Sequence, residues 1–267
     1  MIGFNALGQL GRLGNQMFQY ASLRGIAAKN GYNFMIPPPA ESYEKMDEWR
    51  DHQIFYPFTM ETINNLNVQH TDGERPVVSE KSFGFDEDLY NNCPKWVDVR
   101  GYLQSEKYFK EIEDVIRKDF TFKPQFLRPS RSMIGSFEDP VSLHIRRTDY
   151  LTLSHHHNNL GLDYYEEALS HFDEDRNVVI FSDDPEWCKE QSLFESDRFL
   201  VAEGNINYTD LCLMSLCKAH IIANSSFSWW GAWLAESEKV IAPSKWFGPD
   251  NKHLDTTDLY CEGWIVI

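Results

Sequence analysis

After residue 140 the chain alternates short apolar runs with amphipathic segments, and this regular alternation limits the folds open to it. Apolar runs separated by helical patterns are typical of parallel strands joined by crossover helices. We expect strands at residues 141–145, 178–181, 199–201, 221–223 and 240–242. Helices are expected over residues 163–172, 185–194, 208–218 and 227–236. The second half is therefore predicted to be a Rossmann-like α/β domain.

The first half is less regular. A glycine-rich turn leads into a predicted helix over 15–29, a second helical pattern covers 107–119, and the proline- and aromatic-rich stretch 37–94 gives no readable pattern. Pro124 and Pro129, with serine and arginine around them, predict a linker. We expect two domains, residues 1–135 and residues 136–267, with the last residues able to pack back on the first domain.

The charge of the chain excludes some partners. With 25 Lys and Arg against 41 Asp and Glu, the formal net charge of this 267-residue chain is −16. Such a field repels nucleic acids and anionic membranes, so an anionic ligand must be held by local arginines. The five cysteines form no Cys-x-x-Cys pair, which favours reduced, buried thiols. We find neither a signal peptide nor a stretch long enough to cross a bilayer, and we expect a cytoplasmic protein.

Polar clusters follow the predicted strands at residues 144–149, 182–184, 224–228 and 244–245. In open parallel sheets, ligands bind beyond the carboxyl ends of the strands. The cluster at residues 224–228 lies between an apolar strand and an aromatic helix, where backbone N–H groups and the helix dipole favour an anion. Helix capping by Asn224 or Ser225 explains the same residues equally well.

The segment 144–149 holds two adjacent arginines at a strand end. A guanidinium fork matches two phosphate oxygens, so Arg146 or Arg147 can neutralise a diphosphate without a metal while the other pairs with Asp149. A purely structural network of arginine and aspartate is the alternative. His144 is either a structural residue or a hydrogen-bond partner for a ribose or base.

Asp183 and Asp184 end the next strand, and three interpretations are open. The pair can hold Mg²⁺, one carboxylate can accept two hydrogen bonds from guanine, or one can cap the helix that Pro185 begins. We favour Asp183 for the ligand and Asp184 for the cap. Residues 155–157 are three consecutive histidines in a polar loop, and we assign them no metal because adjacent side chains rarely point at one ion.

Four segments together resemble the motif set of glycosyltransferase family 11, the α-1,2-fucosyltransferases. The match runs through nearly the whole chain in the family's order. The four segments are Gly11-Arg12-Leu13-Gly14-Asn15-Gln16-Met17-Phe18-Gln19-Tyr20-Ala21, His144-Ile145-Arg146-Arg147-Thr148-Asp149-Tyr150, Phe181-Ser182-Asp183-Asp184, and residues 224–234.

The resemblance implies an α/β, GT-B-like fold in which two Rossmann-like domains face a central cleft. It implies metal-independent, inverting transfer of L-fucose from GDP-L-fucose to a hydroxyl of an acceptor glycan, usually the 2-OH of a galactose. No cofactor or metal is expected, and the partners are the GDP-L-fucose donor and a galactose-containing acceptor.

The resemblance also assigns roles by position. Arg146 matches the arginine that binds the diphosphate and stabilises departing GDP, with Arg147 and Asp149 bracing its loop. Asp149 is also a candidate catalytic residue. The other positions implied to bind the donor are Gly14, Asn15, Gln16, His144, Asp183, Asn224, Ser225, Ser226, Phe227 and Ser228.

The general base stays open. Some related fucosyltransferases carry a glutamate shortly after the arginine motif, but residues 150–154 here hold no carboxylate. Asp149, Asp163 and the histidines at 155–157 are candidates, and an oxocarbenium-like route needs little help from a base.

Two departures from the family bear on these expectations. Thr148 stands where many members carry glycine, which we expect to be silent. The membrane anchor of eukaryotic members is not found here, so a bacterial or viral enzyme is expected.

Three other functions compete with this prediction. One is a fucosyltransferase of another linkage, such as α-1,3 or α-1,6. A second is a catalytically silent GDP-sugar or glycan-binding protein. The third is a Rossmann oxidoreductase, which the missing Gly-x-Gly-x-x-Gly fingerprint disfavours.

Overall fold

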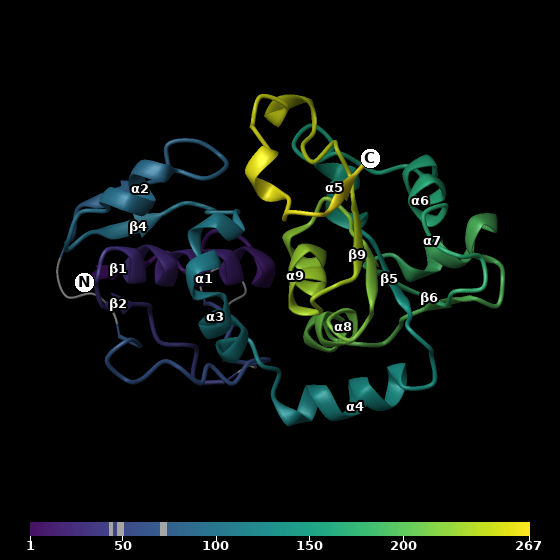
Figure 1. The fold of residues 1–267 in the computed structure, drawn as a ribbon, viewed down its shortest axis with the longest axis horizontal. Coiled ribbons are helices and arrows are strands. Elements are labelled where there is room, and N and C mark those ends of the chain that lie inside the picture. The colour runs from purple at the N-terminus through teal and green to yellow at the C-terminus, as the bar shows by residue number, and fades with distance from the viewer. Residues whose placement is uncertain (43–44, 47–50, 70–73) are drawn as a thin grey trace. The chain divides into compact units, whose positions relative to one another are not determined.

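The computed structural model describes residues 1–42, 45–46, 51–69 and 74–267 (Figure 1). The chain divides into two compact units. Unit 1 consists of Met1–Lys123 and Asp255–Cys261, and unit 2 of Pro124–Leu254 and Glu262–Ile267. The division after Lys123 lies before the boundary expected at residue 135.

Unit 1 contains a parallel sheet in the order β2-β1-β4-β3. Its strands are β1 (Ile2–Gly3), β2 (Phe34–Met35), β3 (Val77–Ser79) and β4 (Asp98–Arg100). Its helices are α1 (Leu13–Lys29), α2 (Glu87–Asn92) and α3 (Glu113–Asp119), with single 3₁₀ turns at η2 (Glu106–Tyr108), η3 (Lys110–Ile112) and η6 (Thr257–Leu259). The helix predicted over 107–119 is therefore wrong in its first half, where two 3₁₀ turns precede α3.

The long helix α1 forms the centre of unit 1. It is buried along most of its length, and Gly25 allows a close approach to η2, because a Cβ atom there would lie 1.7 Å from the backbone oxygen of Tyr108. Asp119, at the end of α3, is fully buried and pairs with Arg24 of α1. The same carboxylate accepts a hydrogen bond of 2.7 Å from the Tyr20 hydroxyl. An ion pair and packing therefore hold α1 in its place.

Unit 2 contains a six-stranded parallel sheet in the order β10-β9-β8-β5-β6-β7. Its strands are β5 (Val141–Ile145), β6 (Val178–Ser182), β7 (Phe199–Val201), β8 (Ala219–Ile221), β9 (Lys239–Ala242) and β10 (Ile265–Val266). The strands predicted at 141–145 and 199–201 have the expected bounds. The strand predicted at 221–223 instead spans Ala219–Ile221, so residues 222–223 belong to the turn that follows it.

The helices of unit 2 are α4 (Pro124–Ile134), α5 (Thr148–Thr152), α6 (Leu162–Leu169), α7 (Pro185–Lys189), α8 (Asn207–Met214) and α9 (Ser226–Leu234). Single 3₁₀ turns follow at η4 (Ser192–Phe194) and η5 (Pro249–Asn251). The linker predicted around Pro124 and Pro129 is helical: both prolines lie in α4, which begins where the two units divide. Proline suits the first turn of a helix, because its fixed φ is helical and the N–H that it lacks would have no partner within the helix. Phe126 of α4 packs against Tyr208 of α8.

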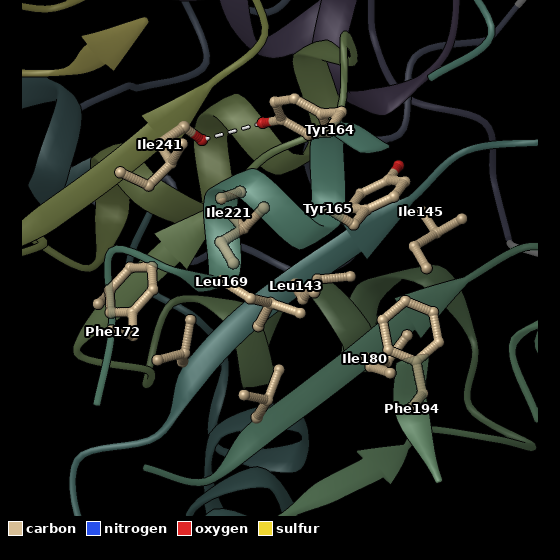
Figure 2. Packing of buried hydrophobic residues seen from close by; sticks show 14 of the residues in the cluster. Leu143, Ile145, Tyr164, Tyr165, Leu169, Phe172, Ile180, Phe194, Ile221 and Ile241 are labelled. Carbon is tan, nitrogen blue, oxygen red and sulfur yellow. Dashed lines mark hydrogen bonds between the residues drawn. The ribbon is translucent and has the colours of Figure 1, made fainter. Parts of the chain in front are cut away.

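The two faces of this sheet bury different side chains, as the alternation along a strand requires. On one face, Leu143, Ile180 and Ile221 pack under α6, as Figure 2 shows. The hydroxyl of Tyr164 in α6 donates to the backbone oxygen of Ile241 at 3.3 Å. On the other face, Phe181 and its neighbour Val179 meet side chains of α8 and α9. Truncating Leu143 to alanine would therefore cost about 2–5 kcal/mol of stability.

All five cysteines are free thiols, and four of them are buried. Burial raises the pKa of Cys188 and Cys212 to about 11, so these thiols stay protonated near neutral pH. In the parts of the chain that the structure describes, there is no helix long and apolar enough to cross a membrane.

Candidate functional site

The candidate site lies at the carboxyl edge of the sheet in unit 2. From β5 the chain adds β6 and β7 on one side, and α8 then returns it to β8 on the other side of β5. The carboxyl ends of β5 and β8 therefore flank the point where the strand order reverses, which is where open α/β sheets bind ligands. The predicted polar clusters at 144–149, 182–184 and 224–228 lie at or just after the carboxyl ends of β5, β6 and β8, so the topology brings all three to this edge.

Arg146 lies at the centre of a charge network. Its guanidinium Nη2 is 2.7 Å from Asp149 Oδ1, and Nη1 is 3.1 Å from Asp183 Oδ2. Burial alone lowers the pKa of Arg146, but the charges of Asp183 and Asp149 outweigh burial and raise it. The guanidinium is thus a fixed positive charge with one fifth of its side chain exposed. It combines the charge and the fork geometry that phosphate oxygens require.

Arg147 has a different environment. Its Nε lies 3.1 Å from Asp184 Oδ2, and its guanidinium carbon lies 3.8 Å from the centre of the Trp187 ring. Stacking on an aromatic ring and pairing with a carboxylate use both the plane and the charge of the guanidinium. Arg147 therefore joins the loop after β5 to α7, consistent with the bracing role that the resemblance implies.

The two adjacent aspartates, Asp183 and Asp184, have different partners. Asp184 caps α7 by accepting from the backbone N–H of Trp187 at 3.4 Å, which confirms the predicted cap. Asp183 accepts from the backbone N–H of Arg147 at 2.8 Å and from the Thr148 hydroxyl, in addition to its ion pair with Arg146. Both oxygens of Asp183 thus have partners within the protein, and its predicted contact with the donor stays a prediction.

His144 is a buried, neutral imidazole. Its Nδ1 lies 2.9 Å from the Ser228 hydroxyl, and its ring lies 5.9 Å from that of Phe227. Burial, together with the positive charge of Arg146, lowers the pKa of His144 to about 3. His144 therefore offers hydrogen bonds rather than charge and ties β5 to the first turn of α9.

The turn after β8 is held by its own polar side chains. Ser225 caps α9 by accepting from the backbone N–H of Phe227 at 3.3 Å, so the capping interpretation holds for Ser225. Asn224 Nδ2 donates to the backbone oxygens of Asn158 and Trp246, both at 2.8 Å. Asn224 therefore fixes the turn against two other loops. Ser226 begins α9, whose amino-terminal end carries the partial positive charge of the helix dipole.

Tyr150 is a site residue that the sequence did not assign. Its hydroxyl donates to the backbone oxygen of Asn224 at 3.0 Å, and its ring stacks on that of His157 with centroids 4.1 Å apart. One histidine of the predicted polar loop is therefore packed against the site. The available signal was the position of Tyr150 directly after Asp149 in the arginine motif.

The glycine-rich turn belongs to unit 1 and lies between β1 and α1. Gly8 and Gly11 adopt positive φ angles of 98° and 89°. Gln16 Nε2 donates to the backbone oxygen of Gly11 at 3.2 Å, and Gln16 Oε1 accepts from the backbone N–H of Gln53 at 2.6 Å. The amide of Gln16 thus braces the turn itself.

The neighbouring predicted residues are also held inside unit 1. Asn15 Oδ1 accepts a 2.7 Å hydrogen bond from Gln104 Nε2, and Gly14 is buried in α1. Donor contacts of Gly14, Asn15 and Gln16 stay predictions. In the described ranges, no group of three or more His, Cys, Asp and Glu residues is arranged to hold a metal ion.

Comparisons with curated proteins give one family. The model described as "Glycosyl transferase family 11" matches residues 2–267. An "Alpha-1,2-colitosyltransferase" of Escherichia coli is 32% identical, with 96% of each chain covered. The "O-antigen biosynthesis glycosyltransferase WbnK" of Escherichia coli is 28% identical, covering 96% of this chain and 97% of that protein. "Galactoside alpha-(1,2)-fucosyltransferase 2" of Bos taurus is 28% identical over 89% of this chain and 71% of that protein.

Solved structures share the fold at low sequence identity. The NodZ alpha-1,6-fucosyltransferase soaked with GDP-fucose aligns with a TM-score of 0.56 and 13% identity, covering 95% of this chain and 97% of that chain. POFUT1 in complex with GDP aligns with a TM-score of 0.55 and 13% identity, covering 88% of this chain and 94% of that chain. Together with the two parallel sheets, these neighbours confirm the predicted α/β, GT-B-like class. As its four sequence motifs predicted, the chain belongs to glycosyl transferase family 11.

Proposed function

We propose that this enzyme transfers L-fucose from GDP-L-fucose to a hydroxyl of a galactose-containing glycan, forming an α-1,2 linkage to the galactose. The observation that carries the proposal is the place of Arg146, a fixed cation at the strand-order reversal that packs on Tyr150, which in turn is hydrogen-bonded to the turn before α9. A diphosphate there meets a guanidinium fork and a helix dipole. The curated relatives named for α-1,2 transfer support the linkage.

The proposed reaction is a displacement with inversion. The bond between the anomeric carbon of fucose and the β-phosphate oxygen breaks, and the electron pair leaves with GDP. The acceptor oxygen forms the new glycosidic bond and loses its proton. Arg146 stabilises the negative charge that grows on the diphosphate, which is the type of interaction that contributes most to catalysis.

We propose that no metal takes part in this step. In metal-dependent transfers a divalent cation neutralises the leaving diphosphate, and here Arg146 supplies that charge. The aspartates that suggested magnesium are engaged with arginines: Asp183 with Arg146, and Asp184 with Arg147. Activity in the presence of EDTA tests this directly, since a loss restored by Mg²⁺ or Mn²⁺ contradicts it.

Asp149 is the proposed proton acceptor. Its Oδ1 pairs with Arg146, while 39% of its side chain is exposed and accessible to an acceptor. A loose, oxocarbenium-like transition state needs little proton transfer, which suits a carboxylate that also serves as the partner of Arg146. Asp149→Asn separates the role of Asp149 as a proton acceptor from its role as a partner of Arg146, because the amide keeps an oxygen for Arg146 but cannot take a proton.

A second donor is a candidate because of the colitosyltransferase at 32% identity. Colitose is L-fucose without its 3-hydroxyl group, so both sugars present the same 6-methyl group and ring configuration. A site that hydrogen-bonds the 3-hydroxyl would reject colitose strongly, whereas a site without that contact would accept both. Comparing kcat/KM for GDP-L-fucose and GDP-colitose decides between the donors.

The same assay tests the remaining alternatives. Linkage analysis of the product separates α-1,2 from α-1,3 or α-1,6 transfer. Tight donor binding without turnover on any galactoside would favour a silent GDP-sugar-binding protein.

A further inference from the structure

Tyr150 joins the two loops that flank the strand-order reversal. It lies on α5, immediately after the arginine motif, and its hydroxyl donates to the backbone oxygen of Asn224 at 3.0 Å. Asn224 begins the turn that leads into α9. A second link, from His144 Nδ1 near the end of β5 to the Ser228 hydroxyl in the first turn of α9, measures 2.9 Å. The separation of the arginine loop from the turn is therefore fixed by side-chain hydrogen bonds.

The ring of Tyr150 has a partner on each side. The imidazole of His157 stacks on it at 4.1 Å with an interplanar angle of 6°, and the guanidinium carbon of Arg146 lies 5.5 Å from its centroid. Burial raises the pKa of Tyr150 to about 12, against the opposing effect of Arg146. The hydroxyl thus keeps its proton and remains a donor to the carbonyl of Asn224.

The backing surface behind Tyr150 is itself held in place. His157 pairs with Phe247 in an isolated β-bridge, and the backbone oxygen of His156 accepts from Gly248 at 3.0 Å. Gly248 has no room for a side chain, because a Cβ atom would lie 2.5 Å from the backbone oxygen of Ser154. Burial lowers the pKa of His157, which keeps the stacked ring neutral near pH 7.

These contacts form a closed chain. Arg146 packs on Tyr150, Tyr150 holds the carbonyl of Asn224, and the Asn224 amide is bonded to the backbone of Asn158, next to His157. A diphosphate that binds both Arg146 and the start of α9 needs these groups at one separation. Positional errors of about 1 Å are enough to weaken such sites markedly.

We propose that Tyr150 is a positioning residue for the diphosphate of the donor, which it serves by holding the Arg146 loop at a fixed distance from the Asn224 turn, with His157 as the backing ring. The inference rests on the proposed function, since it presumes that the GDP moiety binds at this edge.

The test is GDP affinity by calorimetry in Tyr150→Phe, which loses the hydroxyl and keeps the stacked ring. Tyr108→Phe is the matched control, because the buried Tyr108 hydroxyl of unit 1 also donates to a backbone carbonyl, that of Gly84, at 3.5 Å. We expect the Kd for GDP to rise about fivefold to tenfold in Tyr150→Phe, or about 1–1.4 kcal/mol. The Kd should stay within twofold of wild type in Tyr108→Phe, although both variants lose some thermal stability.

Three further measurements separate positioning from general loosening. Affinity for guanosine, which lacks the diphosphate, should be unchanged in Tyr150→Phe. In the transfer assay the KM for the donor should rise more than kcat falls. His157→Phe, which keeps a flat ring, should retain more GDP affinity than His157→Ala.

The outcomes are distinguishable. Equal affinity for GDP in wild type and in Tyr150→Phe overturns the positioning role and leaves the proposed function intact. Equal losses of GDP and guanosine affinity also overturn it, because they indicate general loosening. Wild-type protein with no measurable affinity for GDP contradicts the proposed function and this inference together.

Discussion

Asp183 lies 3.1 Å from the guanidinium of Arg146 through one oxygen, and its other oxygen accepts from a backbone N–H at 2.8 Å. A carboxylate used in this way orients an arginine. The guanidinium of Arg146 is therefore already oriented before an anion binds, so little reorganisation is needed on binding. Preorganised charge of this kind is what makes electrostatic stabilisation effective in an enzyme.

Replacing Arg146 with lysine should lower kcat for transfer at least 100-fold. Lysine keeps the charge but loses the fork that contacts two oxygens at once. Steady-state kinetics with the donor and a galactoside would measure the change. The matched control is Arg176→Lys, since Arg176 pairs with Glu238 at 2.6 Å in a surface ion pair of unit 2. Turnover within tenfold of wild type in Arg146→Lys would remove Arg146 from its proposed role.

Replacing Asp183 with asparagine should raise the Kd for GDP about tenfold with little loss of fold. The amide retains an oxygen for the N–H of Arg147 but loses the charge that faces Arg146, so the guanidinium becomes less well oriented. Calorimetry gives the affinity, and circular dichroism checks the fold. If Asp183 instead binds guanine directly, the variant should lose its preference for GDP over ADP, which titration with both nucleotides would reveal.

Replacing Asp184 with alanine should lower the free energy of unfolding by about 1–2 kcal/mol, because the cap of α7 is lost and Arg147 loses its partner. Urea denaturation measures the change. Asp184→Asn is the matched variant, since asparagine caps helices nearly as well as aspartate. A destabilisation equal in both variants would show that the ion pair with Arg147 outweighs the cap.

Acid should destabilise the protein through its buried histidines. Burial lowers the pKa of His220 to about 4, so the folded state binds this proton less tightly than the unfolded state, whose pKa is near 6.5. The stability linked to His220 is therefore present above pH 6.5 and lost as the pH falls from 6.5 through 4, by about 1–2 kcal/mol at pH 5.

His220→Gln tests that linkage. Its free energy of unfolding should fall less between pH 7.5 and pH 5 than that of wild type, whereas replacing the exposed His253 with glutamine should leave the slope unchanged. Denaturation curves at both pH values supply the comparison. Parallel slopes in wild type and His220→Gln would contradict a neutral, buried His220.

The sequence predicted the sheet of unit 2 well because buried parallel strands appear as continuous apolar runs, as at residues 141–145. It placed β8 two residues late, since Ile222 and Ala223 are also buried and apolar although they lie outside the strand. Pro124 and Pro129 suggested a linker because proline usually interrupts helices. In the structure α4 begins at Pro124 and continues through Pro129.

The site was predictable as far as chain position determines it. Residues that follow β5, β6 and β8 must meet at the carboxyl edge, so the clusters around Arg146, Asp183 and Asn224 could be found from the sequence. The partners of these residues could not be found from the sequence. Side-chain geometry decides which of two adjacent carboxylates, Asp183 or Asp184, pairs with Arg146 and which caps α7. The stack of Tyr150 on His157 depends on the path of the loop between them, which no periodicity records.

The most direct test of the account is release of GDP from GDP-L-fucose by the purified protein, with β-galactoside acceptors and EDTA present, followed by linkage analysis. We predict acceptor-dependent GDP release, an α-1,2-linked fucose on galactose, and loss of both in Arg146→Ala. Wild-type release that requires a divalent metal, or that persists in Arg146→Ala, would contradict transfer supported by Arg146 without a metal.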